Sequence, residues 1–483
     1  RNLNSLVTIY VTTIILSFLT LIFISDVETT LFKMFISCVG LFIISMIILF
    51  PLSQRIISST QSKERISDIV EKINPDTIKV LRYGKEIMPS YDLTDIDENP
   101  IFVLNDLAIR TLNDNDWLTS IFILEEIENK LLATLREIIK QKADKHSKNS
   151  KQEIRETINV FLIIVKTIAY HAIELQQEGV LRNVIVFIES LHHFRAKNQA
   201  AWYDVIELNY FIGNLLELFL DSKLEYICRM GIRMNTRIMI NYITFKLPKE
   251  EEIFDLVYNK DKKIKHKDFK TDYSLEWHHI SMEYTKIISQ ITTNAVKLHE
   301  DEIVDEGMNS LVDIISKIIP MDIGDNQKLQ LVRRTCWEIH ELTKLRSNEG
   351  VGSNFYVHTL SIELKKGIEL GEELFKQLMF TYTYIHIILA KNKKLDWFDI
   401  TELRVAGEEF KRCPSKSPLC KKSLVCIVKL FDKIREIIEG DIEKNELTYI
   451  TLFEQVNLIK DWAIDSELEK KIDNLISNFR DYE

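Results

Sequence analysis

Glycine and proline are scarce in this chain, with 13 glycines and 8 prolines among 483 residues. Both residues interrupt helices, and both are frequent in the turns of sandwiches and barrels, so their scarcity argues against an all-β fold. Charged residues make up 28% of the chain and are mixed with many leucines and isoleucines. This composition predicts an all-α protein.

Clustered metal ligands are also lacking. The six cysteines are scattered, as is typical of reduced thiols in a cytoplasmic protein, and lie at Cys38, Cys228, Cys336, Cys413, Cys420 and Cys426. The last three lack the close spacing of a zinc knuckle. The adjacent pairs His192–His193 and His278–His279 face different sides of a helix. We therefore predict no metal site and no cofactor.

Local catalytic signatures are absent as well. The sequence contains no HExxH, phosphate-binding GxxxxGK[ST], dinucleotide-binding GxGxxG or nucleophile-elbow GxSxG motif. We therefore predict no catalytic residue. An active site assembled from distant residues on several helices would leave no such signature, so an enzyme stays open as an alternative.

Charge is missing from two long stretches near the N-terminus. Residues 6–24 and 34–52 contain no Asp, Glu, Lys or Arg, and each is about as long as the ~20 residues that span a membrane as a helix. Only residues 25–33 separate them. We predict a transmembrane helical hairpin over residues 1–53. A cleaved signal peptide fits the first stretch poorly, because its apolar run is too long and no small-residue cleavage site follows.

The charges that flank the two spans predict their orientation. The short connector carries Asp26 and Glu28 against Lys33, whereas basic residues flank the other ends, at Arg1, Arg55, Lys63 and Arg65. Lys and Arg next to membrane spans are retained in the cytoplasm. We therefore expect a two-pass protein of the cell (plasma) membrane with both termini cytoplasmic.

Small and hydroxylated residues recur inside the two spans and allow membrane helices to approach closely. They are Thr13, Ser17 and Thr20 in the first span and Ser37, Gly40 and Ser45 in the second. We predict that this face packs the two spans together, and oligomerisation through it is the alternative. Neither span contains an ionisable residue that would mark an ion path, so a pore would require an oligomer.

The rest of the chain divides into a neck or linker (54–103), a helical-repeat-like domain (104–325) and a C-terminal helical domain (326–483). Apolar residues recur at helical spacing in three pairs of segments, at 104–131, 164–194 and 287–318. Each pair has a short polar turn between its two halves. The pairs loosely resemble tetratricopeptide pairs but lie about sixty residues apart rather than thirty-four. We expect a cytoplasmic, degenerate α-solenoid.

Residues 104–131 carry a resemblance to a known family. Leu107, Ala108, Arg110 and Leu112 lie in the first helix, and the turn contains Asn115, Asp116, Thr119 and Ser120. This stretch is similar to a segment of a large family of uncharacterised bacterial predicted membrane proteins, although Trp117 replaces the family's proline. The family usually has four membrane helices rather than two. The resemblance implies a membrane-anchored bacterial protein and brings no activity.

Aromatic residues are interpreted as core. Trp277, Trp337, Trp397 and Trp462 each fall within an amphipathic segment, and residues 200–219 are apolar nearly all round. We therefore predict that these tryptophans and this helix are buried.

These observations favour a membrane-anchored protein that acts by binding a partner, as a scaffold, a sensor or a bacterial defence component. Its expected partners are the lipid bilayer and either another protein or a second copy of itself. The net charge of −10 makes nucleic acid an unfavourable partner, and a small molecule stays open. The first alternative is an oligomeric effector whose hairpins form a pore or disrupt the bilayer, and the second is an enzyme.

Overall fold

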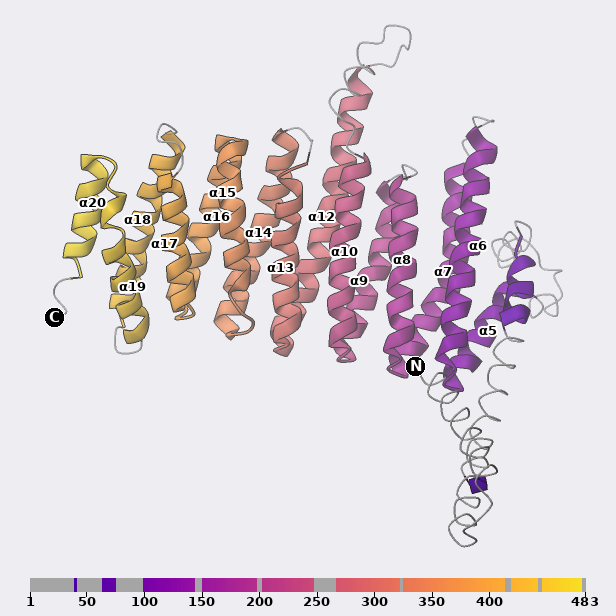
Figure 1. The fold of residues 1–483 in the computed structure, drawn as a ribbon. Coiled ribbons are helices and arrows are strands. Elements are labelled where there is room, and N and C mark those ends of the chain that lie inside the picture. Colours follow the sequence, from indigo (N-terminus) through magenta and orange to yellow (C-terminus); the bar gives the residue numbers. More distant parts are fainter. Residues whose placement is uncertain are drawn as a thin grey trace, which may run out of the picture. The chain divides into compact units, whose positions relative to one another are not determined.

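A computed structural model describes residues 39–40, 63–74, 99–143, 150–197, 202–246, 266–321, 325–412, 418–441 and 445–479. Every regular element in these ranges is a helix (Figure 1), which confirms the all-α prediction. Val39 and Gly40 are helical, but the other residues of the predicted membrane hairpin lie outside the described residues. These include five of the residues predicted to pack the two spans together, namely Thr13, Ser17, Thr20, Ser37 and Ser45.

The chain forms two compact units, Arg1–His171 and Ala172–Glu483, with the division inside helix α7 (Ser150–Glu174). In the first unit, residues 63–71 are helical, and α5 (Pro100–Asn113) packs on α6 (Trp117–Ala143). The side chain of Asn99 caps α5 by accepting a 3.0 Å hydrogen bond from the backbone N–H of Ile101.

One described helical stretch, Glu153–Glu174, is long and apolar enough to cross a bilayer. However, 61% of its most apolar window is buried within the protein. The core helix of a soluble protein has the same properties, so this stretch is weak evidence for a membrane span.

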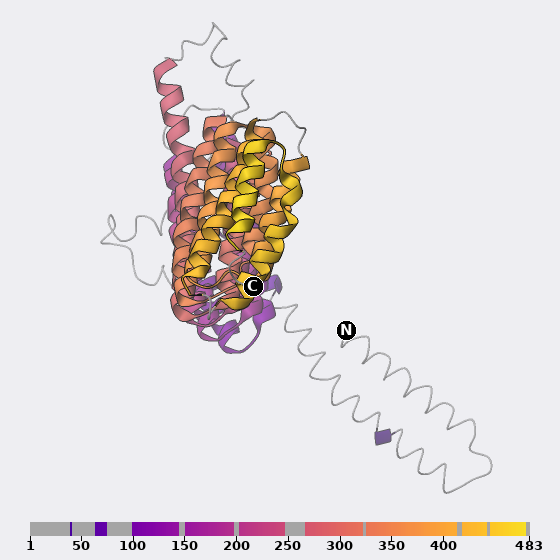
Figure 2. The ribbon, with the colours of Figure 1, turned by 90° about the vertical axis from the view of Figure 1, so that its left-hand side faces the viewer.

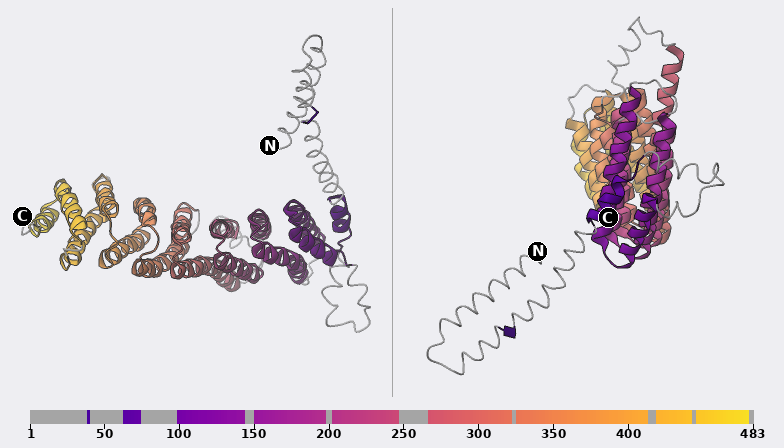
Figure 3. Two further views of the ribbon diagram at one scale, coloured as in Figure 1. Left: turned by 90° about the horizontal axis from the view of Figure 1, so that it is seen from below. Right: turned by 90° about the vertical axis from the view of Figure 1, so that its right-hand side faces the viewer.

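The second unit is a stack of helices in two layers, seen nearly end-on in Figure 3 (left). The A layer contains α9 (Trp202–Asp221), α12 (His266–Leu298), α14 (Asp325–Glu349), α16 (Glu372–Lys391), α18 (Pro418–Glu439) and α20 (Ser466–Ser477). The B layer contains α8 (Glu178–Lys197), α10 (Glu225–Lys246), α13 (Asp301–Ile318), α15 (Phe355–Leu370), α17 (Trp397–Arg412) and α19 (Glu446–Leu458), and the short 3₁₀ helix η2 (Lys460–Trp462) follows α19.

The chain alternates between the two layers, and each helix also packs on the next helix of its own layer. Figure 2, which looks along the stack from α20, shows the helices of both layers running nearly parallel to one another. Such a stack of helix pairs is the architecture of an α-solenoid, as the apolar periodicity predicted.

The same tight turn joins most of the helix pairs. A non-glycine residue with positive φ ends the first helix at Asn115, Gln176, Lys223, His299 and Lys393, and Gly350 takes this position after α14. In all six turns the next residue donates its N–H to the carbonyl five residues earlier, at 2.8–3.1 Å. This is the long hydrogen bond of a Schellman motif, which satisfies a carbonyl at the helix end. The six turn residues therefore mark equivalent points of the repeats.

The predicted pairs at 104–131, 164–194 and 287–318 correspond to α5/α6, α7/α8 and α12/α13. The sequence reasoning missed the pairs that contain α9/α10, α14/α15, α16/α17 and α18/α19. The gap between the second and third predicted pairs therefore holds a complete further pair, and Gln176 and Lys223 lie only 47 positions apart.

Glycines let paired helices approach closely at two equivalent places. A Cβ added at Gly231 of α10 would overlap the side chain of Leu216 in α9, and one added at Gly307 of α13 would overlap Thr292 in α12. Each glycine follows its turn residue by eight positions, and its contact precedes that turn residue by seven. The repeats therefore share a packing register as well as a turn.

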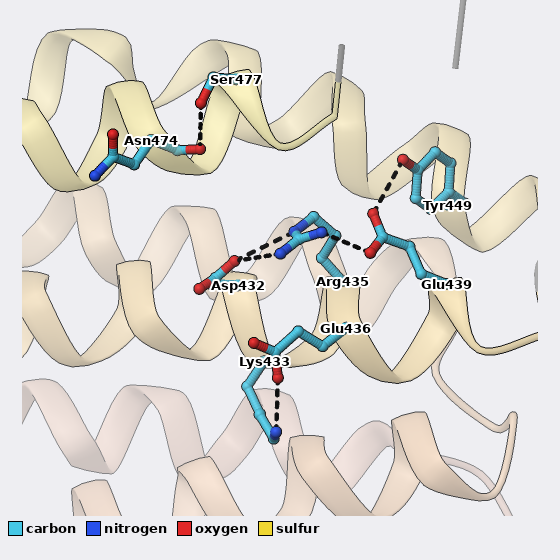
Figure 4. Close-up of polar contacts among 8 residues, drawn as sticks. All are labelled: Asp432, Lys433, Arg435, Glu436, Glu439, Tyr449, Asn474 and Ser477. Atoms are coloured by element: carbon cyan, nitrogen blue, oxygen red, sulfur yellow. Dashed lines mark hydrogen bonds and ion pairs between the residues drawn. The ribbon is translucent and has the colours of Figure 1, made fainter. Parts of the chain in front are cut away.

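The C-terminal helices are joined by a polar cluster around Arg435 of α18 (Figure 4). Its guanidinium donates to Asp432 Oδ1 at 2.9 Å and to Glu439 Oε2 at 2.6 Å, and it lies 5.9 Å from the ring centroid of Phe479. Tyr449 Oη donates to the other oxygen of Glu439 at 3.4 Å. These contacts connect α18 to α19 and to the residues that follow α20.

Candidate binding surface

Three large apolar side chains lie exposed on the outer face of the A layer. Tyr210 in α9 is 62% exposed, Trp337 in α14 is 56% exposed and Phe380 in α16 is 60% exposed. Each precedes its turn residue by thirteen positions, and the same position of α12 holds the exposed Lys286. Equivalent positions of four consecutive A-layer helices thus form one series, which we call the A-layer stripe: Tyr210, Lys286, Trp337 and Phe380.

The position thirteen residues before the turn residue also holds exposed apolar side chains in the first unit. Phe102 of α5 and Ile163 of α7 precede Asn115 and Gln176 by the same thirteen positions, and both are exposed. Exposed apolar residues scattered singly are ordinary on protein surfaces. Five exposed apolar residues at one repeat position are therefore a recurring feature of the repeats rather than single scattered residues.

The stripe contradicts part of the sequence interpretation. Trp337 and Trp397 were predicted to be core and are 56% and 63% exposed, and the supposedly buried helix 200–219 exposes Tyr210. Trp462 is fully buried, as predicted, and the Trp277 side chain lies outside the described residues. The error has a physical cause: a helix with one buried face tolerates an apolar residue at its outer edge, where periodicity does not distinguish it from core.

A group of contacting aromatic rings, tilted or edge-on to one another, holds the α14–α16 part of the stripe in place. The His340 ring lies 4.4 Å from the Tyr384 ring and 5.5 Å from the Phe380 ring, measured between centroids. Burial lowers the pKa of His340 to about 4, so its imidazole is neutral at pH 7. Each such ring pair contributes about 0.5–1.5 kcal/mol beyond its buried area, so these contacts hold the rings in place, and the neutral His340 adds no charge to them.

Three exposed cations lie in or beside the stripe, and none of them pairs with a carboxylate of the described residues. In the part of the chain that the structure describes, Lys286, Arg333 and Lys344 form no ion pair, and each is exposed. Arg333 and Glu341 lie one helical turn before and after Trp337. The A layer therefore presents positive charge that is free to meet a ligand.

The B layer differs, because three arginines of α10 are paired with carboxylates of neighbouring helices. Arg237 of α10 donates to Glu189 of α8 at 2.6 and 2.8 Å, and Arg233 donates to Glu306 of α13 at 2.7 and 2.5 Å. Arg229 contacts Glu302 in the same way. These half-exposed pairs contribute at most about 1 kcal/mol each, but they neutralise the charge of the three arginines.

A second aromatic patch lies at the N-terminal ends of the B-layer helices. Phe355 of α15 and Trp397 of α17 are 57% and 63% exposed. His358 and Phe398 connect them, with successive ring centroids 6.0, 5.8 and 5.9 Å apart. This edge patch spans only two neighbouring helices, so it offers a smaller surface than the stripe.

A buried polar network anchors the turn that precedes α15. Arg346 donates to Asn354 Oδ1 at 2.7 Å and also to the Ser353 carbonyl. Asn354 Nδ2 in turn donates to Asp399 Oδ2 at 2.7 Å. Burial, and next the neighbouring carboxylate of Asp396, raise the pKa of Asp399 to about 7. The network ties the end of α14 to the start of α17.

A serine, a histidine and a carboxylate lie together between α15 and α17, the three side chains of a hydrolytic triad. Glu402 Oε2 accepts a 3.2 Å hydrogen bond from Ser361 Oγ and lies 3.0 Å from His358 Nδ1. A catalytic triad needs histidine between the serine and the carboxylate, so that the imidazole removes the serine proton. Here the carboxylate lies in the middle and Ser361 is fully buried, so the arrangement lacks the nucleophile–base contact.

A third polar group is wholly internal. Tyr284 Oη lies 3.3 Å from Nδ1 of His192, and Asn235 Nδ2 donates to the Tyr284 carbonyl at 3.1 Å. Burial, and next the charge of Arg195, lower the pKa of His192 to about 3. A neutral imidazole enclosed by tyrosines is a packing element of the core rather than a site open to substrate.

The four turn residues of the resemblance form a helix cap. Asn115 has φ 62°, and Asp116 accepts from Thr119 Oγ1 at 2.6 Å and from the Thr119 N–H at 3.3 Å. Ser120 Oγ lies 2.8 Å from Thr111 Oγ1 of the preceding helix. This stretch therefore starts α6 and fixes the α5–α6 turn, which is a structural role.

Ligands of a metal do not converge in the ranges that the structure covers: no three His, Cys, Asp or Glu side chains there could hold an ion. Cys228, Cys336 and Cys420 are buried and free, Cys426 is exposed, and Cys38 and Cys413 lie outside the described residues. Burial raises the pKa of Cys228 and of Cys336 to about 12, so neither thiol is reactive at pH 7.

Comparison with known proteins adds little. No family model matches the chain. No curated protein matches it either. Among solved structures it is similar to a circular tandem repeat protein with a novel repeat topology and enhanced subunit contact surfaces, at 12% identity and a TM-score of 0.29, over 88% of this chain and 96% of that one. A likeness this distant carries no argument, so the repeat architecture rests on the order and packing of this chain's own helices.

Proposed function

We propose that this protein is a membrane-anchored helical-repeat scaffold that binds a protein partner along the A-layer stripe. The observation that carries the proposal is the exposure of Tyr210, Trp337 and Phe380 at one repeat position. Covering a Phe-sized side chain removes its apolar surface from water and contributes about 1.5–3 kcal/mol. Aromatic anchors at the centre of a contact surface are the residues that dominate protein–protein affinity.

The stripe suits this role because it is rigid before the partner arrives. The rings of His340, Phe380 and Tyr384 already contact one another, so little side-chain entropy is lost when a ligand covers them. Stacked repeats also hold the four stripe positions at fixed separations, which is how solenoids build extended binding surfaces.

The membrane anchor is proposed from the sequence. The uncharged stretches 6–24 and 34–52 have the length of membrane helices, and the basic flanks favour cytoplasmic termini. Tethering would hold the helical stack at the bilayer, where it meets partners that are themselves bound to the membrane at a raised effective concentration. Scaffold, sensor and defence roles at the membrane all require this arrangement.

Partner capture from native membranes tests the proposal. The full-length chain is cross-linked in its membrane, purified and compared with Trp337→Ala, and Trp397→Ala serves as the control. Both tryptophans are more than half exposed, but only Trp337 lies in the stripe. We expect Trp337→Ala to lower the captured partner by about tenfold or more, as for an interface anchor, and Trp397→Ala to retain it. Equal capture by the wild type and both variants would contradict the proposal.

A further inference from the structure

We infer that the partner presents an acidic, proline-containing segment in the polyproline II conformation, with every third residue meeting one helix of the A layer. The inference rests on the proposed function, because it identifies the occupant of the same stripe. Its basis is the spacing of the stripe, the shape of its side chains and the charge around it.

Spacing selects the conformation of the bound segment. Packed helices lie about 8–10 Å apart, and the stripe presents one residue per A-layer helix. A polyproline II helix rises about 3.1 Å per residue with three residues per turn, so equivalent side chains recur about every 9 Å. A β-strand repeats every ~6.6–6.8 Å on one face, and an α-helix every ~5.4 Å. Of these three repeat distances, only that of the polyproline II helix matches the distance between neighbouring A-layer helices.

Side-chain shape supports the same conformation. Tyr210, Trp337 and Phe380 are all aromatic and all more than half exposed. Flat aromatic rings are the surfaces on which proline-rich segments dock, because both the ring and the polyproline II helix are rigid before binding. Rigid partners lose little conformational entropy, so a modest contact area suffices for binding.

Charge selects the residues between the apolar ones. Lys286 occupies a stripe position itself, and Arg333 flanks Trp337, and neither has an intramolecular carboxylate partner in the described part of the chain. By contrast, Lys376 beside Phe380 is already paired with Glu372 and Glu373, at 3.0 and 2.9 Å. An acidic residue of the bound segment opposite Lys286 would form an ion pair with it. Further acidic residues near Arg333 would pair with that side chain.

Single-stranded nucleic acid would also offer flat rings and negative charge, but the stripe suits it less. Glu341 lies one turn from Trp337 on the exposed side of α14, and the whole chain carries a net charge of −10. Proteins that track a phosphate backbone present a continuous basic groove, which this face does not have. We therefore expect every third residue of the segment to contact one stripe residue. In order, an apolar residue contacts α9, an acidic residue contacts α12, and apolar residues contact α14 and α16.

The test uses the full-length chain in lipid nanodiscs and three fluorescent probes followed by anisotropy. The first probe is a synthetic peptide with leucine, glutamate, leucine and leucine at every third position and proline or glutamate between them. The second has the same composition with leucine at every second position. The third is a single-stranded oligonucleotide of similar length. We expect the first to bind at least about tenfold more tightly than the other two.

Two variants link the binding to the stripe. Trp337→Ala should weaken the first peptide about tenfold or more. Lys286→Glu should weaken it as well, and a peptide with lysine in place of its stripe glutamate should recover affinity for Lys286→Glu alone. Lys286 and Trp337 are exposed, and unchanged far-ultraviolet circular dichroism would show that both variants stay folded.

The outcomes separate this inference from the proposed function. If Trp337→Ala abolishes capture of the native partner while the two peptides bind equally, the stripe is a docking surface but the polyproline II inference is wrong. Tighter binding of the oligonucleotide would overturn the inference in favour of nucleic acid. If neither native capture nor peptide binding depends on Trp337, both proposals fail.

Discussion

Replacing Asp399 with asparagine should stabilise the protein at alkaline pH by more than it does at pH 5. Asp399 is almost fully buried and accepts from Asn354 and from the Asp396 N–H, at 2.7 and 3.1 Å. Its surroundings include the carboxylate of Asp396, and its second oxygen has no hydrogen-bond partner. Such a site favours the neutral acid.

The sign and size follow from the pKa. Burial raises the pKa of Asp399 from 3.8 to about 7, so the folded state holds a proton that the unfolded chain releases. Stability from this group is therefore complete below about pH 4, is lost progressively as the pH rises from about 4 to about 7, and is fully lost above pH 7. The difference corresponds to roughly 4 kcal/mol at about 1.4 kcal/mol per pKa unit. Asp399→Asn keeps a neutral group of the same shape and removes the loss.

Denaturant unfolding at pH 5 and pH 8 measures the effect, with the wild type compared with Asp399→Asn and with Asp473→Asn. Asp473 is an exposed acid of α20 and controls for the removal of one charge. We expect the stability advantage of Asp399→Asn over the wild type to grow by about 3 kcal/mol between pH 5 and pH 8, because about two of the three pKa units lie above pH 5. The neighbouring His386, whose pKa burial lowers to about 4, stays neutral across this range. Equal pH dependence of wild type and Asp399→Asn would refute the reasoning.

Three further predictions test the fold and the anchor. Gly307→Val should destabilise the α12–α13 contact by about 1–3 kcal/mol in denaturant unfolding, because its side chain would overlap Thr292, whereas Gly213→Ala, whose added Cβ would lie 3.7 Å from its nearest neighbour, should be nearly neutral. Trp462→Ala should lower the unfolding free energy by about 3–5 kcal/mol, since this ring is fully buried; a change within 0.5 kcal/mol would show that the ring does not pack as described. Removal of residues 1–53 should shift the protein from the membrane to the soluble fraction after cell breakage, and persistence of the truncated chain in sedimented, detergent-extractable membranes would refute the anchor.

The sequence predicted the helical-repeat class because apolar periodicity reports which face of a helix is buried. Leu104 and Ala108 of α5, and Leu311 and Ile315 of α13, are all core residues as that spacing requires. The repeat length was harder to find, because the turns are closed by non-glycine residues such as Lys223 and His299, whose positive φ has no composition signal. Helix α9 is apolar nearly all round and so shows little amphipathic periodicity. The pair α9/α10 was missed for that reason.

The candidate site was not predicted, and the reason is physical. Trp337 lies next to Cys336 and three positions before His340, both buried, so its place on the helix borders the core face. Exposure at that place depends on whether another helix covers it, which is a tertiary property. Once the turn residues are aligned, the equivalence of Tyr210, Lys286, Trp337 and Phe380 can be seen in the sequence, so an alignment of the repeats was the missing signal.

Self-association through the stripe is the remaining alternative to a different protein partner, and charge weighs against it. In a two-fold symmetric contact, the order of the stripe reverses across the axis, so Lys286 of one copy would face Trp337 of the other. That pair is favourable, but Arg333 and Lys344 of both copies, which flank Trp337 on the same helix, would then gather at the contact, where Glu341 supplies only one carboxylate per copy. We therefore expect sedimentation of the full-length chain in detergent to give the same mass for the wild type and Trp337→Ala. A dimer that Trp337→Ala converts to a monomer would assign the stripe to self-association instead.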